Sequence, residues 1–292
     1  TLNIYAVMDL FSRYVVGWLI HREESGEVAR HLFETLIERY AIQSNQLRIH
    51  TRKDFIDREL RQAYEYKLIL LQQQYFPADF TANISKDIKL LSIPGALLVG
   101  EQWMMIKKLT ESMGTVFRWF DNERRMAFPA LTQVLSDSYY EKLIVEMINE
   151  VLDDAGVVLD NASPELQKIR MNLYKKRNEL RRVFEKMVQK MAKSGYTADI
   201  DESFSNGRRV IAVFSEYKRQ VKGILHGESD SRKTAFIEPE ETIELNNDVF
   251  TLENEEIKEV QKILRALTAK LSVYAPLLQQ YIQIIGEYDF IR

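Results

Sequence analysis

The chain has 292 residues, 46% of them hydrophobic, which is enough to bury a substantial core and to form about two domains. Its net charge of −3 excludes a nucleic-acid polycation along the whole length, so any affinity for nucleic acid must come from local patches. There is no Cys, which excludes disulfides and cysteine metal sites.

The sequence also indicates where the protein works. It contains no apolar run of about eighteen residues and no signal-peptide pattern. Together with the absence of Cys, this predicts a cytoplasmic protein that makes no contact with a membrane. Because the first residue is Thr1, we expect the chain to be a fragment of a longer protein.

The pattern of residues 1–50 predicts the start of an α/β domain. Two β-favouring runs, Ile4–Met8 and Tyr14–Ile20, predict a hairpin. Residues 25–40 have the apolar spacing of an amphipathic helix, and Leu47–His50 predicts a short third strand. Strand, strand, helix, strand is a common α/β beginning.

Asp9 follows the first of these strands. Residues 9–18 (DLFSRYVVGW) resemble the integrase-core, RNase H-like domain of insertion-sequence transposases. The resemblance implies that Asp9 is the remnant of a metal-binding carboxylate, but two-metal chemistry needs several carboxylates. The second should stand two residues after His50, where this chain has Arg52. We therefore expect a truncated integrase-core fragment over residues 1–51 without a working catalytic site; alternatively, Asp9 is a solvated acid beside a turn.

Residues 53–160 are predicted to be mainly helical. The expected helices are Arg58–Gln74, Asp87–Leu91, Gly100–Met113 with a continuation or kink to Arg125, Phe128–Leu131, and Tyr139–Leu152. Four aromatic residues in this region could stack on bases or fill the core: Trp103, Phe117, Trp119 and Phe120. Their helical spacing among other apolar residues favours the core.

Two long helices follow. Ser163 and Pro164 are a helix N-cap and first residue. A seven-residue repeat then predicts helix–helix pairing. Its positions are Leu173, Arg177, Leu180, Phe184, Met187 and Met191 in the outgoing stretch, and Ile257, Val260, Leu264, Leu267, Leu271, Tyr274 and Leu278 in the returning one. Residues 163–194 hold ten Lys/Arg against three Glu, and residues 239–270 hold eight acids against four Lys/Arg. Opposite charge suits antiparallel partners of roughly 45 Å each. An ordinary buried helical hairpin is the other interpretation.

Residues 203–237, called the tip below, separate the two helices. Asn206-Gly207 is a turn signal, and Arg209–Phe214, Val221–Leu225 and Thr234–Ile237 predict strands. The tip has seven basic residues and three acids, so we predict that its cations contact the phosphates of DNA without reading sequence. These residues are Arg208, Arg209, Lys218, Arg219, Lys222, Arg232 and Lys233. A merely soluble basic hairpin is the alternative.

Several short motifs in this order resemble the second MutS subfamily (MutS-two). They are residues 76–80 and 93–102, then 160–170 (DNASPELQKIR), 206–208 (NGR), 216–218 (EYK), 222–226 (KGILH), 229–231 (SDS), 236–239 (FIEP) and 245–247 (LNN). The resemblance covers about residues 59–292. Ala212 and Arg232 depart from it, because the family has Pro and Gly there, and Gly tolerates backbone angles that Arg resists.

The resemblance implies a mainly α fold with small β parts and five segments. They are the integrase-core fragment at 1–51, a helical MutS-like core at 52–160, an outgoing lever helix at 161–200, a clamp at 201–238, and a returning lever helix with core at 239–292. It also implies a homodimer that grips branched or mismatched DNA under the control of ATP and Mg, suppression of recombination and, in some members, contact with the ribosome.

This chain is expected to lack the catalytic parts of that family. None of the eleven Gly is followed by Lys, so there is no P-loop, and we expect no cofactor and no enzymatic activity in these residues. Residues 286–290 stand about where the family's ATPase domain begins. His226 matches a His of the family, for which we expect packing or hydrogen bonding. A transposase-like recombination protein and a coiled-coil protein-interaction scaffold remain alternatives, and a scaffold has no need of a basic tip.

Overall fold

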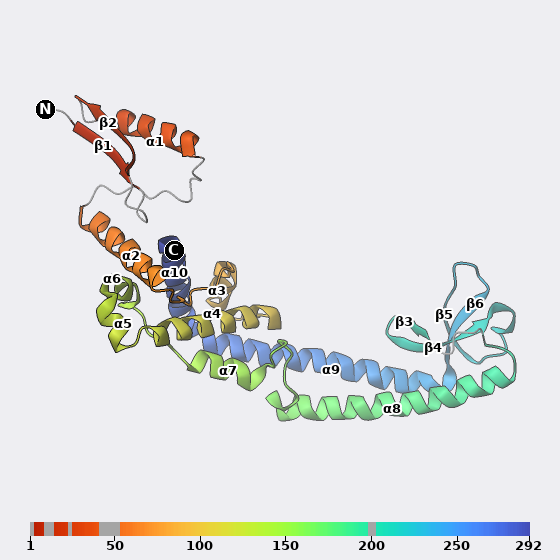
Figure 1. The fold of residues 1–292 in the computed structure, drawn as a ribbon. Coiled ribbons are helices and arrows are strands. Elements are labelled where there is room, and N and C mark those ends of the chain that lie inside the picture. Colours follow the sequence, from red (N-terminus) through yellow and green to blue (C-terminus); the bar gives the residue numbers. More distant parts are fainter. Residues whose placement is uncertain (1–2, 9–14, 23–24, 41–52, 198–202) are drawn as a thin grey trace. The chain divides into compact units, whose positions relative to one another are not determined.

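The computed structural model describes residues 3–8, 15–22, 25–40, 53–197 and 203–292 (Figure 1). They are mainly helical with a small antiparallel sheet, as the sequence predicts. The chain divides into two units. The first holds Thr1–Pro94, Glu101–Ile148 and Leu271–Arg292, and the second holds Gly95–Gly100 and Asn149–Lys270. The five-segment division expected from the sequence stays a prediction.

The N-terminal elements are a hairpin and a helix. Strands β1 (Asn3–Met8) and β2 (Val15–His21) pair antiparallel, and helix α1 (Gly26–Tyr40) follows. A Cβ on Gly17 would lie 2.6 Å from Leu36 Cδ2, so a larger residue there would displace the Leu36 side chain, which packs α1 against β2. The predicted third strand, Asp9 and Arg52 lie outside the described residues, and the integrase-core resemblance stays a prediction.

A set of helices forms the rest of the first unit. They are α2 (Lys53–Leu71), α3 (Ser85–Leu91), α4 (Gly100–Trp119), α5 (Asn122–Ala127), α6 (Pro129–Thr132), the 3₁₀ turn η2 (Gln133–Leu135), α7 (Leu143–Val151) and α10 (Ala275–Ile291). Helix α7 begins four residues later than predicted. The reason is tertiary: the Tyr281 hydroxyl donates to Tyr139 O at 2.8 Å and accepts from Glu141 N at 2.9 Å, so these backbone groups are used outside a helix.

Aromatic side chains fill this core. Trp103 is fully buried and Phe120 nearly so. Phe76 meets Trp119 edge-on, with ring centroids 5.0 Å apart, and meets Tyr288 at 4.9 Å. Such edge-to-face pairs add to the free energy gained from burial. The expectation that these aromatic residues are core rather than base-stacking groups is confirmed for Trp103, Trp119 and Phe120.

Tyr281 gives this unit a pH dependence. Burial raises the pKa of its hydroxyl to about 12. The unfolded chain ionises this group near its ordinary pKa, so above that pH the unfolded state binds fewer protons than the folded state, and stability falls as pH rises toward 12. We expect Tyr281→Phe to flatten the fall by up to about 1.4 kcal/mol per pH unit, measured by urea unfolding at several alkaline pH values. An unchanged slope would contradict the assignment; Tyr274→Phe, at a half-exposed tyrosine, is the control.

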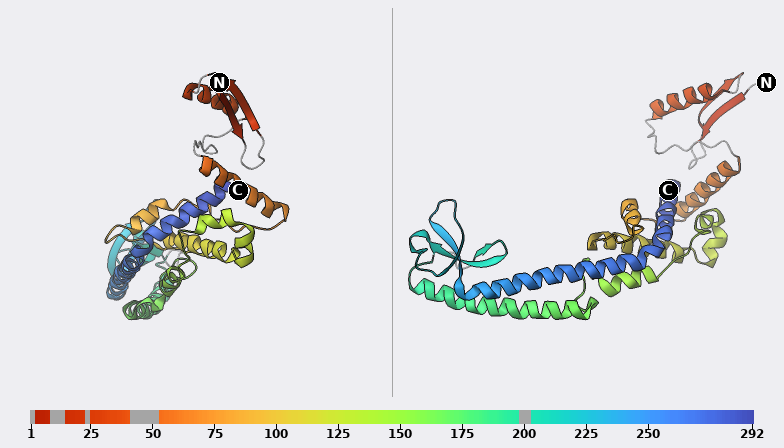
Figure 2. Two further views of the ribbon diagram at one scale, coloured as in Figure 1. Left: turned by 90° about the vertical axis from the view of Figure 1, so that its left-hand side faces the viewer. Right: turned by 180° about the vertical axis from the view of Figure 1, so that it is seen from behind.

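The two long helices α8 (Pro164–Lys193) and α9 (Glu240–Leu271) run antiparallel side by side (Figures 1 and 2). Ser163 caps α8, accepting from Leu166 N at 3.0 Å. In the seam Leu173 and Leu180 pack with Val249. The predicted charge pairing is present as three ion pairs between the helices: Arg170–Glu256 at 2.7 Å, Lys176–Asp248 at 2.9 Å and Arg177–Glu253 at 2.7 Å.

The seven-residue repeat predicted from Ile257 to Leu278 differs from the structure in two places. Ile257 is 55% exposed rather than in the seam. Helix α9 ends at Leu271, and the 3₁₀ turn η5 (Ser272–Tyr274) separates it from α10. The next helix carries Pro276 in its first turn. Proline has no N–H to donate to the preceding turn, so the backbone restarts there instead of continuing the repeat to Leu278.

The tip is a four-stranded sheet with the strand order β3-β4-β6-β5, all pairs antiparallel. The strands are β3 (Ser203–Ser205), β4 (Arg208–Phe214), β5 (Gly223–Glu228) and β6 (Thr234–Pro239), with the 3₁₀ turn η4 (Ser215–Tyr217) after β4. Another short 3₁₀ turn, η3 (Asp160–Ala162), precedes α8. The three predicted tip strands are confirmed, and β3 was not predicted.

Candidate nucleic-acid interface

The tip is attached to the end of α8 by an apolar cluster. Phe184 and Met187 of α8 belong to one buried group with Ile211 and Val213 of β4 and with residues of the neighbouring strands. Tyr196 and Tyr217 pack beside this group, with ring centroids 4.8 Å apart. The sheet therefore covers the last turns of α8. This packing fixes the position of the loops that join the strands.

A buried polar cluster joins the sheet to the start of α9. The Glu238 carboxylate is fully buried at the end of β6. It accepts from Arg208 Nη1 at 2.7 Å and Asn246 Nδ2 at 2.9 Å, and lies 2.6 Å from His226 Nε2. Arg208 also donates to Asn247 Oδ1 at 2.5 Å. A buried carboxylate is tolerated when opposite charge and donors surround it in this way.

This cluster brings together residues that stand apart in the sequence. The motifs NGR, KGILH, FIEP and LNN each contribute a side chain to it. His226 has the hydrogen-bonding role expected from the sequence. Sequence reasoning did not single out Glu238, although the FIEP motif was the signal for it. Because Arg208 donates to Glu238 and Asn247, two N–H groups of its guanidinium are already used in hydrogen bonds within the protein.

Two more of the seven predicted cations contact other side chains of the tip or of α8. The Arg209 guanidinium lies over the rings of Phe184 and Phe204, at 5.6 and 5.5 Å from their centroids. Lys218 Nζ pairs with Glu228 Oε1 at 2.6 Å. This ion pair lowers the pKa of the Glu228 carboxyl. Their positive charges are thus partly neutralised or held against aromatic faces.

The other four predicted cations are exposed: Arg219, Lys222, Arg232 and Lys233. Their side chains form no ion pair or hydrogen bond with any described residue. Two contacts place their loops together. Ser215 N donates to Lys233 O at 2.9 Å, and the Ser215 hydroxyl donates to Arg232 O at 2.7 Å.

The cations follow β5 from end to end. Lys222 precedes the first residue of β5, and Arg232 and Lys233 lie in the turn that joins β5 to β6. A six-residue strand is roughly 20 Å long, so the cations could meet several successive phosphates of one backbone. The segment 215–222, which carries Arg219, connects the two ends.

Arg232 occupies a backbone conformation that favours glycine. Its φ is +56°, in the left-handed region. Arg232 thus adopts an angle that Gly adopts more easily. The consequence is a guanidinium on a tight turn, exposed to solvent.

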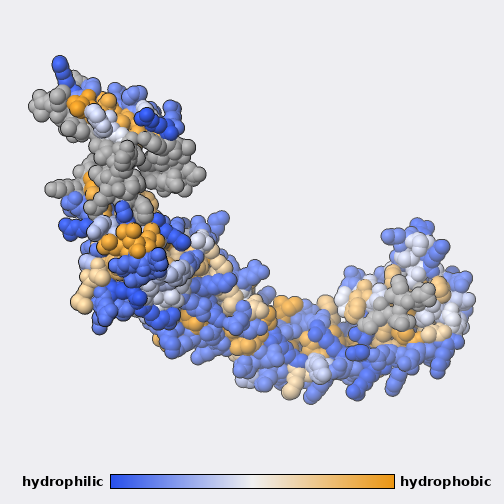
Figure 3. Space-filling view, viewed as in Figure 1, coloured by the Kyte–Doolittle hydropathy of each residue, from blue (hydrophilic) through white to orange (hydrophobic). Residues whose placement is uncertain are grey.

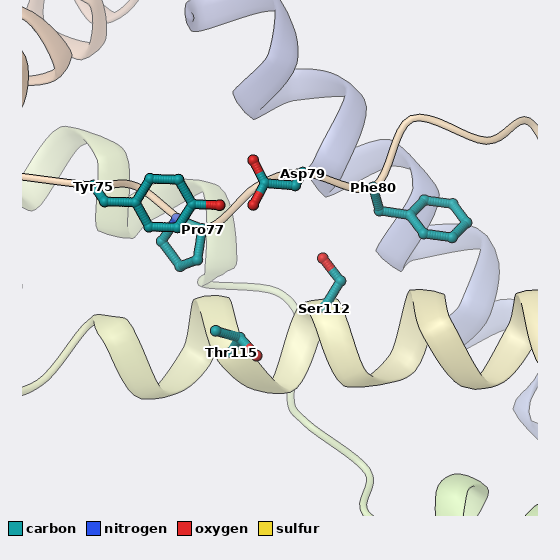
Figure 4. A pocket seen from close by; sticks show the side chains of 6 residues that line it. All are labelled: Tyr75, Pro77, Asp79, Phe80, Ser112 and Thr115. Atoms are coloured by element: carbon teal, nitrogen blue, oxygen red, sulfur yellow. The ribbon is translucent and has the colours of Figure 1, made fainter. Parts of the chain in front are cut away.

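A shallow hollow of about 350 Å³ in the first unit has different chemistry (Figure 4). Tyr75, Asp79 and Ser112 line it together with Pro77, Phe80 and Thr115. The Tyr75 and Ser112 hydroxyls point toward the Asp79 carboxylate (Figure 4). A carboxylate there disfavours phosphate. Among the residues that the structure describes, no group of three or more His, Asp or Glu could hold a metal ion, and no helix is long and apolar enough to cross a membrane.

These features define a helical protein whose antiparallel helix pair carries a small basic sheet. The chain is distantly related to proteins named endonuclease MutS2. It is 28% identical to that of Lactococcus lactis over 242 residues, 83% of this chain and 31% of the relative. It is 31% identical over 197 residues to that of Pelotomaculum thermopropionicum, 68% of this chain and 25% of the relative. It is 32% identical over 167 residues to that of Carboxydothermus hydrogenoformans, 57% of this chain and 22% of the relative.

The chain thus spans less than a third of the length of these curated relatives. No model of a known protein family matches it.

Proposed function

We propose that the tip binds the phosphate backbone of DNA as the clamp of a MutS2-like protein. The observation that carries this proposal is the group of four exposed cations: Arg219, Lys222, Arg232 and Lys233. The relation to proteins named endonucleases, which act on nucleic acid, supports it. Arg208, Arg209 and Lys218 play a second part, because their contacts hold the loops that carry the four.

Recognition of this kind is tolerant of sequence. Positive charge on phosphate carries no information about the bases, and each contact releases condensed counterions. Preference for branched or mismatched DNA would then come from the positions of the DNA phosphates relative to the cations of the tip. This part of the proposal rests on the family resemblance.

Neutralising the four cations tests the proposal. In the variant R219Q/K222Q/R232Q/K233Q, we expect the affinity for a branched DNA to fall more than about tenfold, and the slope of log affinity against log salt to become shallower by roughly 3 to 4. Fluorescence anisotropy of labelled DNA at several salt concentrations measures both. The circular dichroism spectrum should not change, because the four side chains are exposed.

The matched control is K86Q/K89Q/K258Q/R265Q, which removes the same charge from exposed positions elsewhere. It should bind as the wild type does. Equal binding by the tip variant and this control would remove the clamp assignment and leave the coiled-coil scaffold as the better proposal.

The resemblance implies further properties of a longer protein that contains this chain. We propose for that protein a homodimer, ATP-controlled gripping of DNA, suppression of recombination and, as in some members of the family, contact with the ribosome. The proposal assigns no catalytic step and no nucleotide site to residues 1–292.

A further inference from the structure

The basic residues of α8 are not all directed at α9. Of the ten Lys/Arg in residues 163–194, Arg170, Lys176 and Arg177 form ion pairs with α9, and Arg181 pairs with Glu185 of α8 itself at 2.8 Å. Six side chains have no ion pair or hydrogen bond with any described residue. They are Lys168, Lys175, Arg182, Lys186, Lys190 and Lys193.

Five of these six form a straight row, called the outer row below: Lys168, Lys175, Arg182, Lys186 and Lys193. All are exposed, and their spacing is seven, seven, four and seven residues. These steps return to nearly the same side of an α-helix, so the row runs along one face for roughly 38 Å, in steps of at most about 10 Å. Leu173 and Leu180 of the seam each precede a row member by two residues, about 200° around the helix, so the row faces away from α9.

The five charges of this row outnumber the acids beside it on its own helix. Glu179 is exposed on the same face, four residues after Lys175 and three before Arg182, and lies 3.5 Å from Lys176, while Glu185 pairs with Arg181. On the partner helix, four exposed acids, Glu240, Glu241, Glu244 and Glu255, are matched by four exposed cations, Lys258, Lys262, Arg265 and Lys270. The excess of exposed positive charge therefore lies on α8.

Figure 3 shows the lower margin of the α8–α9 pair as mainly hydrophilic toward the tip. On α8, Met171 borders the outer row, and Tyr174 lies roughly a quarter turn from it. The centre of a protein–protein interface is depleted of charge and rich in aromatic and apolar anchors. A row of five cations with one bordering methionine lacks this pattern and instead suits a polyanion.

We propose that the outer row of α8 binds the phosphate backbone of a nucleic-acid duplex, at a surface separate from the loops of the tip. A helix of thirty residues held by a partner helix is straight and stiff, and a duplex is also stiff over this length, since its persistence length is about 50 nm. One turn of a duplex is about 34–36 Å long, so a row of roughly 38 Å can meet phosphates of both strands where they cross the side that faces α8, without bending either partner. This inference stands on the α8 geometry and does not require the tip to bind.

The test compares four proteins: the wild type, the outer-row variant K168Q/K175Q/R182Q/K186Q/K193Q, the tip variant described above, and the two combined. Anisotropy is measured with a 40-base-pair DNA duplex and the same duplex in RNA. We expect the outer-row substitutions to weaken binding to at least one duplex more than about tenfold and to make the salt slope shallower by roughly 4, in both the wild-type and the tip-variant backgrounds.

The control K86Q/K89Q/K258Q/R265Q/K270Q removes five positive charges from exposed positions outside the row. It should bind like the wild type. The inference is overturned if the outer-row variant binds both duplexes within twofold of this control. It is also overturned if sedimentation shows that the substitutions abolish self-association and leave duplex binding unchanged, because the row would then be a protein interface.

The two proposals fail separately. A tip variant that binds like the wild type, together with a weakened outer-row variant, removes the clamp assignment and keeps this inference. The opposite result removes this inference and keeps the clamp.

Discussion

Replacing Leu180 by aspartate is expected to separate α8 from α9 and to lower the free energy of unfolding of this pair by about 4 kcal/mol or more. Leu180 is 5% exposed and packs with Leu173 and Val249 in the middle of the seam. The substitution removes a buried aliphatic side chain and places a carboxylate without a partner among apolar groups. Helices of this length depend on such packing, because intrinsic propensity stabilises them only weakly.

Urea unfolding followed by circular dichroism measures the effect. Gln189→Asp is the control, because Gln189 is exposed on the same helix and the substitution has the same cost in helix propensity. If Leu180→Asp and Gln189→Asp lowered stability equally, the seam between α8 and α9 would be wrong.

Removing the carboxylate of Glu238 is expected to loosen the joint between the sheet and α9. Glu238 is fully buried, and Glu238→Ala leaves Arg208 and His226 without their acceptor. Breaking a buried ion pair from one side costs about 3 to 5 kcal/mol. Hydrogen exchange of the β4 and β6 amides measures this, since local opening of the sheet exposes them to exchange.

Two further variants make this prediction specific. Glu228→Ala breaks the exposed pair with Lys218 and should change the exchange of these amides little. The double variant R208A/E238A removes both charges and should recover part of the protection lost in Glu238→Ala, because no charge is then left buried without its partner. Unchanged exchange in Glu238→Ala would show that the polar cluster does not hold the tip.

Local features of the sequence determined the long helices and most of the tip. Ser163 and Pro164 start α8 because a cap and a fixed φ act within a few residues of each other. The apolar repeat placed Leu173, Leu180 and Phe184 in the buried face, because helical periodicity alone decides which side chains share a face. Alternating β-favouring residues and turn signals gave β4, β5 and β6 in the same way.

Tertiary contacts decided the features that the sequence interpretation missed. The hydroxyl of Tyr281 keeps residues 139–141 out of α7 from a position about 140 residues away along the chain. Strand β3 exists because it pairs with the start of β4.

The same distinction holds for the candidate site. The sequence determined that the tip and α8 are rich in Lys and Arg, because composition is a property of the chain alone. Only the folded structure decided which of these charges remain available. Arg208 meets Glu238, which is thirty residues away, whereas Lys233 and the outer row meet no acid among the described residues. Charge is neutralised by whatever lies within a few ångströms in space, and distance along the sequence does not determine that separation.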